Sequence, residues 1–307
     1  MPSITVASMP TLCLGEAIVD LVCERPVDDM AQADAFVPHF GGAAANVAYT
    51  AAGEGADVAL AGGAGDDPWG RWLQERLRAV GVDLRWFSLH PGHATPIALV
   101  ALDADGEPDF QIYGDGIPAT IETLEHGLDD AIDHADALFF SSNTLVGEAE
   151  RALTMRARDL ALTGGRPVVF DPNLRLHRWP DRDTAVETVR EAVPGALLVR
   201  ANRAEAELMT GQSDAAGAAA ALVGAGARLA VVTRGPAGAV LRGAVEAEEP
   251  GGPAPSVRSA VGAGDALMGV LLARLALAGF DPVAAAAALP DAVAAGARAV
   301  QRWGAVE

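Results

Sequence analysis

Short apolar runs alternate with helical patterns along most of the 307-residue chain. Strand-like runs lie at 11–23, 57–62, 137–140, 167–170, 196–199 and 228–233. Helical patterns lie at 41–55, 68–81, 148–163, 182–192, 203–224, 263–279 and 282–302. This βα alternation predicts a mostly parallel sheet with helices on both faces, in one α/β domain over 1–307. Ligands of such sheets bind at the carboxyl ends of the strands.

One segment departs from this alternation. Residues 95–113 read as strand, turn at Asp105-Gly106, and strand, which predicts a β-hairpin without a helix. Together with 17–24 and 34–40, the hairpin is expected to form a small separate sheet. A small sheet beside the ligand cleft of an α/β domain would act as a lid. An apolar face on such a lid would let two copies pair, so we expect a homodimer.

Composition and charge exclude several classes of function. The formal net charge is −19, and all 22 basic residues are arginines. The absence of lysine excludes a Walker A lysine, a Schiff-base lysine and the strand lysine of protein kinases. So acidic a chain is not expected to bind nucleic acid. No apolar run is long enough for a membrane span, and no leader pattern opens the chain, so we expect a cytoplasmic protein.

The tetrapeptide GAGD occurs at 63–66 and again at 262–265, in different contexts. The first copy follows a strand and precedes Asp67 and Pro68, which suit the N-cap and first turn of a helix. The proline removes one N–H from that turn and weakens it as an anion site. The first copy is therefore interpreted as a strand-to-helix turn with an acidic cap.

The second copy opens an apolar, small-residue helix with no proline in its first turn. Gly262, Ala263 and Gly264 can therefore direct backbone amides, backed by the helix dipole, at one bound anion. Asp265 would repel a phosphate, but it suits a base that takes the proton from an attacking hydroxyl. A glycine turn with a capping acid remains the local alternative.

Five motifs in order give the chain a family resemblance. "GGAAANVAYTAAGEGADVALAGGAGDDPWG" and "AVGAGDALMG" resemble the N-terminal and C-terminal signatures of ribokinase-like sugar kinases, the PfkB family. "FDPNLRLHRW", "NRAEAELMTG" and "VVTRGPAGAV" resemble three intervening segments of that family. The resemblance covers essentially the whole chain and is strongest to bacterial fructokinases. It implies the ribokinase-like fold and an ATP-dependent, Mg²⁺-requiring carbohydrate kinase.

The resemblance also implies a role for each matching residue. Asp265 would be the general base, and Gly262, Ala263 and Gly264 would bind the transferring phosphate. The sugar would contact Asp20, Gly41, Gly42, Asn46, Arg175 and the lid residue Tyr113. Asn202 would lie near the nucleotide phosphates, and Glu205 would organise Mg²⁺ through its waters. Thr233, Gly235 and Gly238 would line the nucleotide.

Each of these residues also has a local explanation that the sequence leaves open. Asp20 suits an exposed strand position, Asn46 a buried amide and Tyr113 packing of the lid. Gly41-Gly42 suits a turn, Arg175 a surface ion pair with Asp181 or Asp183, and Glu205 a charged helix face. Gly235 and Gly238 suit an ordinary hairpin. The ordered set of motifs, rather than any single member, favours the kinase.

The chain departs from the family pattern in two places. The family commonly has Asp-Thr-Thr before GAGD, where this chain has Ser259, Ala260 and Val261. That acid often helps to bind a monovalent cation, so dependence on such a cation stays open. An arginine often follows the lid hairpin in fructokinases, and "YGDGIPAT" has none. The identity of the sugar is therefore the least specified part of the prediction.

Fructose is the expected sugar, phosphorylated on a primary hydroxyl. 2-Keto-3-deoxygluconate is the first alternative, but its carboxylate needs a second pocket cation, and Arg175 is the only strong candidate. A nucleoside kinase is a further alternative. A dinucleotide-dependent oxidoreductase fits the βα alternation, but no G-x-G-x-x-G follows the first strand. A non-catalytic sugar sensor would not need Asp265.

Overall fold

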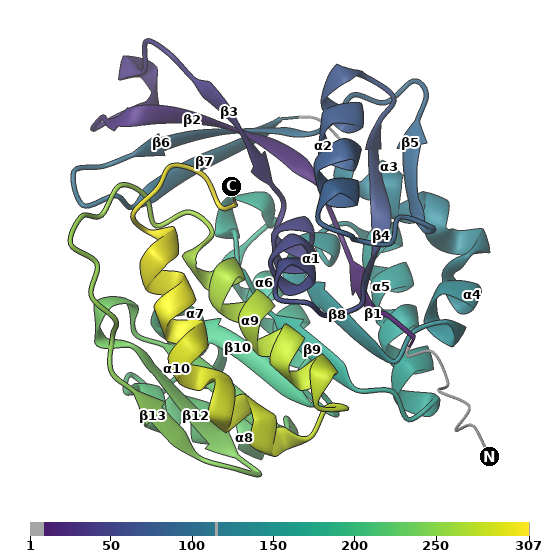
Figure 1. Ribbon diagram of the computed structural model, residues 1–307, viewed down its shortest axis with the longest axis vertical. Coiled ribbons are helices and arrows are strands. Elements are labelled where there is room, and N and C mark those ends of the chain that lie inside the picture. Colours follow the sequence, from purple (N-terminus) through teal and green to yellow (C-terminus); the bar gives the residue numbers. More distant parts are fainter. Residues whose placement is uncertain (1–8, 114–115, 307) are drawn as a thin grey trace.

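A nine-stranded sheet forms the centre of the computed structural model, which describes residues 9–113 and 116–306 (Figure 1). Its strand order is β13-β12-β11-β10-β9-β8-β1-β4-β5. The seven strands from β11 to β5 in this order pair in parallel, and β12 and β13 extend the sheet antiparallel. The strands are β1 (Thr11–Leu14), β4 (Val58–Gly65), β5 (Phe87–His90), β8 (Ala137–Ser141), β9 (Val168–Asp171), β10 (Leu198–Asn202), β11 (Leu229–Thr233), β12 (Ala239–Gly243) and β13 (Ala247–Glu249).

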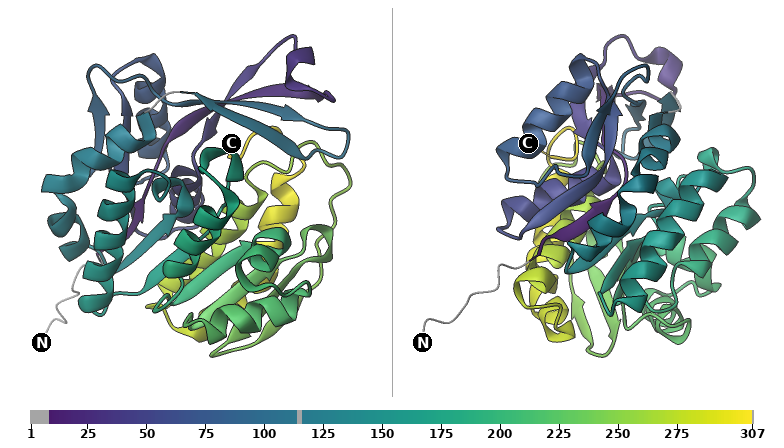
Figure 2. Two further views of the ribbon diagram at one scale, coloured as in Figure 1. Left: turned by 180° about the vertical axis from the view of Figure 1, so that it is seen from behind. Right: turned by 90° about the vertical axis from the view of Figure 1, so that its right-hand side faces the viewer.

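Helices cover both faces of this sheet (Figure 2). One face carries α1 (Ala43–Gly53), α2 (Pro68–Ala79), α9 (Ala263–Leu277) and α10 (Pro282–Ala299). The other carries α4 (Leu128–Asp133), α5 (Glu148–Thr163), α6 (Arg182–Glu191), α7 (Arg203–Thr210) and α8 (Ala215–Gly224), while α3 (Gly116–Glu122) lies at the edge of both cores. Strand side chains alternate between the two cores: Cys13 packs into one, Leu12 and Leu14 into the other. The predicted α/β architecture, a mostly parallel sheet with helices on both faces, is confirmed.

The expected small sheet is present and separate from the central one. It has the order β3-β2-β6-β7, with β2 (Ile18–Pro26), β3 (Val37–Gly41), β6 (Ile97–Leu102) and β7 (Pro108–Tyr113). In Figure 1 it crosses above the central sheet, on the side where the N-terminus of α9 points. The strands match the predicted segments 17–24, 34–40 and 95–113 closely.

The predicted strand 11–23 is wrong as one element, because it is divided between the two sheets. β1 ends at Leu14 and β2 begins at Ile18. Gly15 lies between them at φ 154°, and a Cβ there would come within 2.6 Å of the Ala44 Cβ. This glycine lets the chain leave the central sheet directly beside α1.

The predicted helix 203–224 is also divided. α7 ends at Thr210, and Gly211 follows in the left-handed conformation (φ 75°) that commonly terminates helices. Asp214 then caps α8 by accepting from the Gly217 N–H at 2.7 Å. Among the described elements, α3, α4, β5 and β13 have no counterpart in the sequence prediction. No helix in the described ranges is both long and apolar enough to cross a membrane.

Candidate active site

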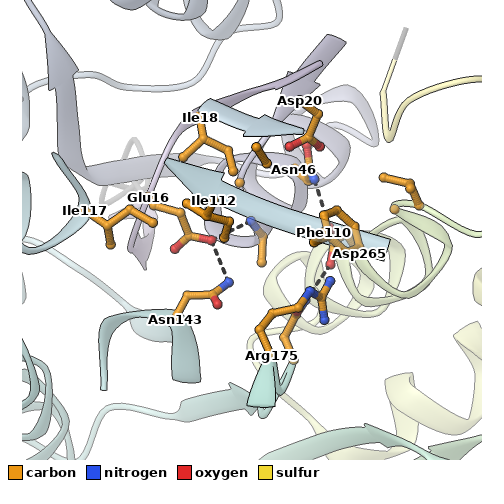
Figure 3. Close-up of a pocket in the computed structure, with 16 residues that line it drawn as sticks. Glu16, Ile18, Asp20, Asn46, Phe110, Ile112, Ile117, Asn143, Arg175 and Asp265 are labelled. Atoms are coloured by element: carbon orange, nitrogen blue, oxygen red, sulfur yellow. Dashed lines mark hydrogen bonds between the residues drawn. The ribbon is translucent and has the colours of Figure 1, made fainter. Parts of the chain in front are cut away.

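A pocket lies between the small sheet and the carboxyl edge of the central sheet (Figure 3). The small sheet contributes Ile18, Asp20, Ala98, Phe110 and Ile112 to its lining. The central domain contributes Glu16 after β1, Gly42, Ala43 and Asn46 of the α1 segment, and Ile117 and Asn143. The loop after β9 adds Asn173 and Arg175, and the α9 segment adds Val261, Gly262 and Asp265. The pocket is where the topology of an open α/β sheet predicts a ligand.

Asp265 is buried in the first turn of α9, where two amides hold its carboxyl group. Asn46 Nδ2 donates to Oδ2 at 2.8 Å, and Asn173 Nδ2 donates to Oδ1 at 3.1 Å. Burial raises the pKa of Asp265, and the Asn46 hydrogen bond together with the Arg175 and Arg200 charges opposes the rise. The arrangement fixes the carboxylate in one orientation at the mouth of the helix.

The N-terminus of α9 has the backbone needed to bind an anion. Gly262 adopts φ 75°, a conformation that favours glycine, and a Cβ there would come within 2.3 Å of Ala305. The first N–H groups of a helix lack intrahelical partners and carry the positive end of its dipole. The Ala263 N–H makes only a long bond, 3.3 Å to the Ala260 carbonyl. The turn contains no proline, unlike that of α2.

Arg200 of β10 lies directly against this turn, although the sequence reasoning did not single it out. A Cβ on Gly264 would come within 2.5 Å of the Arg200 guanidinium. That buried guanidinium donates to Asp171 Oδ2 at 3.1 Å and to Thr233 Oγ1 at 3.0 Å. Burial raises the pKa of Asp171, and the Arg200 charge opposes the rise. Arg200 thus connects Thr233 at the end of β11 to the Gly262–Gly264 turn at the start of α9.

Asp20 and Gly42, two residues predicted to contact the sugar, line the pocket, and Gly41 packs against Asp20 without lining it. A Cβ on Gly41 would lie 2.4 Å from the Asp20 carboxyl carbon, so only glycine leaves room for that side chain. Gly42 has φ 98°, and a Cβ on it would meet the Glu16 carbonyl oxygen at 2.5 Å. Burial, and then the charge of Asp265, raises the pKa of Asp20 to about 8. Asp20 therefore holds its proton to a much higher pH than an ordinary aspartate does.

Arg175 lies in the pocket, and its guanidinium stacks on the Phe110 ring at 4.8 Å from the centroid. Among the described residues, Arg175 forms no ion pair with Asp181 or Asp183, and Asp181 instead caps α6 through the Thr184 N–H at 2.8 Å. Asn173, two residues earlier, was missed by the sequence reasoning. It is one of two non-glycine residues with positive φ among the described residues, at 41°. That conformation places its amide against Asp265.

The predicted nucleotide residues lie along the sheet edge and outside this pocket lining. Asn202 and Glu205 form a capping box at the start of α7, with bonds of 2.9 and 2.8 Å. The other Glu205 oxygen accepts from the Leu174 N–H at 2.8 Å. Gly238 is required by packing, because a Cβ there would meet the Glu249 carbonyl at 2.0 Å. Gly235, with φ 55°, faces open space and leaves room for a ligand.

The structure does not bring Tyr113 to the pocket. In β7, Phe110 and Ile112 line the pocket, and alternation along the strand turns Tyr113 to the opposite face. Tyr113 is 55% exposed, and its hydroxyl donates to Gln111 Oε1 at 2.9 Å. Tyr113 therefore lies outside the pocket lining, and its contact with the sugar stays a prediction.

The first GAGD copy forms the turn that its context predicts. Asp67 caps α2 by accepting from the Gly70 N–H at 2.9 Å, and Pro68 is the first helical residue. Asp66 pairs with Arg71 at 2.5 Å on the surface. None of these residues lines the pocket, so only the second copy can serve it.

The pocket has unused hydrogen-bond acceptors. Asn46 Oδ1, Asn173 Oδ1 and Glu16 Oε2 are buried without a hydrogen-bond partner among the described residues, and all three residues line the pocket. Buried acceptors without donors are costly, so this lining suits a ligand rich in O–H groups. A base, an anion-binding turn and a hydroxyl-binding pocket together can carry phosphoryl transfer to an alcohol.

Comparisons with known proteins agree with this geometry. A model of the pfkB family of carbohydrate kinases matches residues 11–307. The chain is 34% identical over 197 residues to fructokinase-1 of Oryza sativa subsp. japonica and 32% identical over 199 residues to fructokinase-2 of Solanum lycopersicum. These matches cover 64% and 65% of this chain and 61% of each relative, less than two thirds of the relatives' length.

Solved structures match over nearly the whole chain. A double mutant of fructokinase from Vibrio cholerae O395, with fructose, ADP and potassium ion bound, is 30% identical at a TM-score of 0.83. The match covers 97% of this chain and 94% of that one. Aminoimidazole riboside kinase from Salmonella enterica, complexed with aminoimidazole riboside and an ATP analogue, is 26% identical at a TM-score of 0.79, covering 96% and 95%. The chain therefore belongs to the pfkB family of carbohydrate kinases.

Proposed function

We propose that this protein transfers the γ-phosphoryl group of MgATP to a primary hydroxyl of a ketohexose, with fructose as the expected substrate. The observation that carries the proposal is Asp265, buried at the N-terminus of α9 and held by Asn46 and Asn173. The similarity to fructokinases of rice, tomato and Vibrio cholerae supports fructose as the sugar.

In the proposed reaction, the sugar hydroxyl gives its proton to an Asp265 carboxylate oxygen as its own oxygen attacks the γ-phosphorus. The new O–P bond forms while the bond from that phosphorus to the bridging oxygen breaks, and ADP leaves with that electron pair. Asn46 and Asn173 keep the base aimed at the hydroxyl. The Gly262–Gly264 amides stabilise the charge that develops on the transferring group.

The nucleotide is proposed to lie along the sheet edge by Thr233, Gly235 and Gly238, with Asn202 near its phosphates. Both Glu205 oxygens already accept backbone N–H groups, and no cluster of three metal-ligating side chains occurs in the described part of the chain. This donor set fits a hydrated Mg²⁺ carried mainly by the phosphates, with Glu205 contacting its waters. Mg²⁺ bound there would neutralise charge on the transferring phosphoryl group.

The charges of the pocket favour a neutral sugar over 2-keto-3-deoxygluconate. Three carboxyl groups line it, from Glu16, Asp20 and Asp265, and Arg175 is the only cation among its lining residues. Arg175 is already stacked on Phe110, and a substrate carboxylate would compete with Asp265 for this one cation. We therefore keep the keto-acid and nucleoside substrates as the alternatives that a substrate panel must test.

The small sheet is proposed to act as a lid. It supplies Ile18, Asp20, Phe110 and Ile112 to the pocket, so its closure would exclude water from the transferring phosphoryl group. Pairing of two copies through this sheet is a further expectation. Sedimentation velocity with a variant carrying charge at exposed Val37 tests the pairing; a dimer unaffected by the variant would contradict it.

Dependence on a monovalent cation is expected to be weak. Ser259 stands where the family commonly has an acid, and its hydroxyl accepts from the Val261 N–H at 3.1 Å. Turnover should change little when potassium replaces a bulky organic cation at constant ionic strength. Strong activation by potassium would contradict this.

A coupled assay of ADP release with fructose, other ketoses, aldoses, keto-acids and nucleosides tests the activity. Fructose should give the highest kcat/KM. Turnover only with 2-keto-3-deoxygluconate or a nucleoside would replace fructose. Sugar binding without turnover of any substrate would favour a sensor and overturn the proposal.

A further inference from the structure

Glu16 contacts two other parts of the pocket lining, the start of α1 and Asn143. It was not among the site residues predicted from the sequence. It follows β1 and is almost fully buried. Its Oε1 accepts from the Ala43 N–H at 2.7 Å, at the start of α1, and from Asn143 Nδ2 at 2.9 Å. Asn143 in turn accepts from Arg178 at 3.2 Å. These contacts fix the Glu16 carboxyl group in place.

The second oxygen of this carboxyl group, Oε2, is buried and has no hydrogen-bond partner among the described residues. Burial raises the pKa of Glu16. In either protonation state, a buried oxygen of this kind is costly without a partner. A hydroxyl group suits both states, because it can donate to a carboxylate or accept from a carboxylic acid.

Glu150 is a useful comparison, because it shares most of the features of Glu16 but lies outside the pocket lining. It is also buried, it also caps a helix through one oxygen (Gly147 N–H, 2.7 Å), and its Oε2 also lacks a partner among the described residues. However, Glu150 does not line the pocket, and Glu16 does. Glu16 therefore differs from Glu150 in one respect: the carboxyl group that carries its unpaired oxygen lines the pocket.

Glu16 lies at the end of the pocket away from Asp265 (Figure 3). Asn143 and the apolar side chain of Ile117 accompany it there, while Asp20, Arg175 and Asp265 lie toward the other end. A sugar with one hydroxyl at Asp265 would extend toward Glu16. The two ends of the pocket would then select both the length of the sugar and the presence of a polar group at its far end.

We propose that Glu16 contacts the substrate and sets specificity: its Oε2 forms a hydrogen bond with the hydroxyl farthest from the one that is phosphorylated. This proposal rests on the proposed sugar kinase function. It adds a second polar contact that rejects sugars shortened by one carbon or lacking the far terminal hydroxyl. A site built to bind a hydroxyl discriminates strongly against an analogue without it.

The test compares the best sugar of the panel with the deoxy analogue that lacks the terminal hydroxyl opposite the phosphorylated one. The position of phosphorylation is first read from the product by ³¹P and ¹³C NMR. Wild-type enzyme should prefer the full sugar by about 10- to 100-fold in kcat/KM, the loss expected for one hydrogen bond to a carboxyl group. In Glu16→Met, this ratio should fall close to one, because the full sugar loses its contact and the analogue has none to lose.

Glu150→Met is the matched control, since it also removes a buried helix-capping carboxyl group. It should keep the wild-type ratio even if its stability falls. If Glu16→Met does not fold, as judged by circular dichroism, Glu16→Leu serves instead. It also removes both carboxyl oxygens, so the ratio should likewise fall close to one.

The outcomes separate this proposal from the function on which it rests. No turnover of any sugar by wild-type enzyme would overturn both. Turnover with equal kcat/KM for the full and deoxy sugars would overturn only the role of Glu16. Glu16 variants that keep the wild-type ratio would also overturn only the role of Glu16.

Discussion

Asn46 donates a hydrogen bond from Nδ2 to Oδ2 of Asp265 over 2.8 Å, although 219 positions separate the two residues in the chain. The contact depends on the close approach of α1 and α9. Gly269 allows it, because a Cβ at that position would lie 2.5 Å from the Thr50 Cβ. The N-terminal and C-terminal signatures of the family thus meet at one carboxyl group.

Replacing Asn46 by alanine should raise the pKa of Asp265 further, because its amide favours the ionised carboxylate. The base must be ionised to accept a proton, so the acid limb of the kcat–pH profile should move to higher pH by about one unit. Steady-state kinetics between pH 5 and 9 check this. A variant with the wild-type profile and wild-type sugar KM would contradict the role of Asn46.

Asp20→Asn should make stability less dependent on pH. The pKa of Asp20 is raised from 3.8 to about 8, so between these values the folded chain holds a proton that the unfolded chain has lost. The contribution of Asp20 to stability is therefore complete below about pH 4 and is lost as the pH rises toward 8. The stability of Asp20→Asn relative to wild type should increase by about 1.4 kcal/mol per pH unit between pH 5 and 7. Urea unfolding at several pH values measures the difference, and a constant difference would exclude a raised pKa.

Arg200→Met should lower the free energy of unfolding by about 3–5 kcal/mol, because it leaves the buried Asp171 without its cation. The double variant Arg200→Met with Asp171→Asn should recover part of this loss, since no buried charge is then left unpaired. Urea unfolding of the three chains gives the coupling energy. Additive losses would show that the ion pair does not stabilise the fold.

Gly264→Ala should reduce kcat by at least about tenfold, because a methyl group would lie 2.5 Å from the Arg200 guanidinium and shift the turn proposed to bind the phosphate. Gly53→Ala is the matched control. It lies at the end of α1 with no atom within 4 Å of the added carbon, so activity should be unchanged. Equal kinetics in the two variants would contradict the importance of the turn.

The sequence predicts the fold well where local patterns are strong. The helix at 148–163 is found at Glu148–Thr163, and Asp67 and Pro68 start α2 as expected. The strand 11–23 was misjudged because its apolar pattern continues across Gly15, and only packing against α1 ends β1 there. Periodicity does not encode which of two sheets receives a strand.

The candidate site was predicted where motifs mark it and missed where tertiary contacts create it. Asp265, Asn46 and Asp20 come together as the ordered motifs imply. Arg200 sits in an apolar strand, and only its position beside Gly264 reveals a role. Asn173 reaches Asp265 because its backbone adopts a left-handed conformation. The asparagine in "DPNLR" is compatible with this conformation but does not predict it. Phe110 and Ile112, rather than Tyr113, line the pocket, because the register of β6 and β7 decides which face each side chain of β7 takes.

The two GAGD copies provide the most direct test of the account. Steady-state kinetics with MgATP and fructose, and calorimetric titration with fructose, are measured for wild type, Asp265→Asn and Asp66→Asn. Asp265→Asn should lose at least about three orders of magnitude in kcat while fructose still binds, because only the proton acceptor is removed. Asp66→Asn changes a surface ion pair and should keep near wild-type kcat. If Asp265→Asn retained activity, or if Asp66→Asn proved the more damaging, the assignment of Asp265 as the base would be wrong.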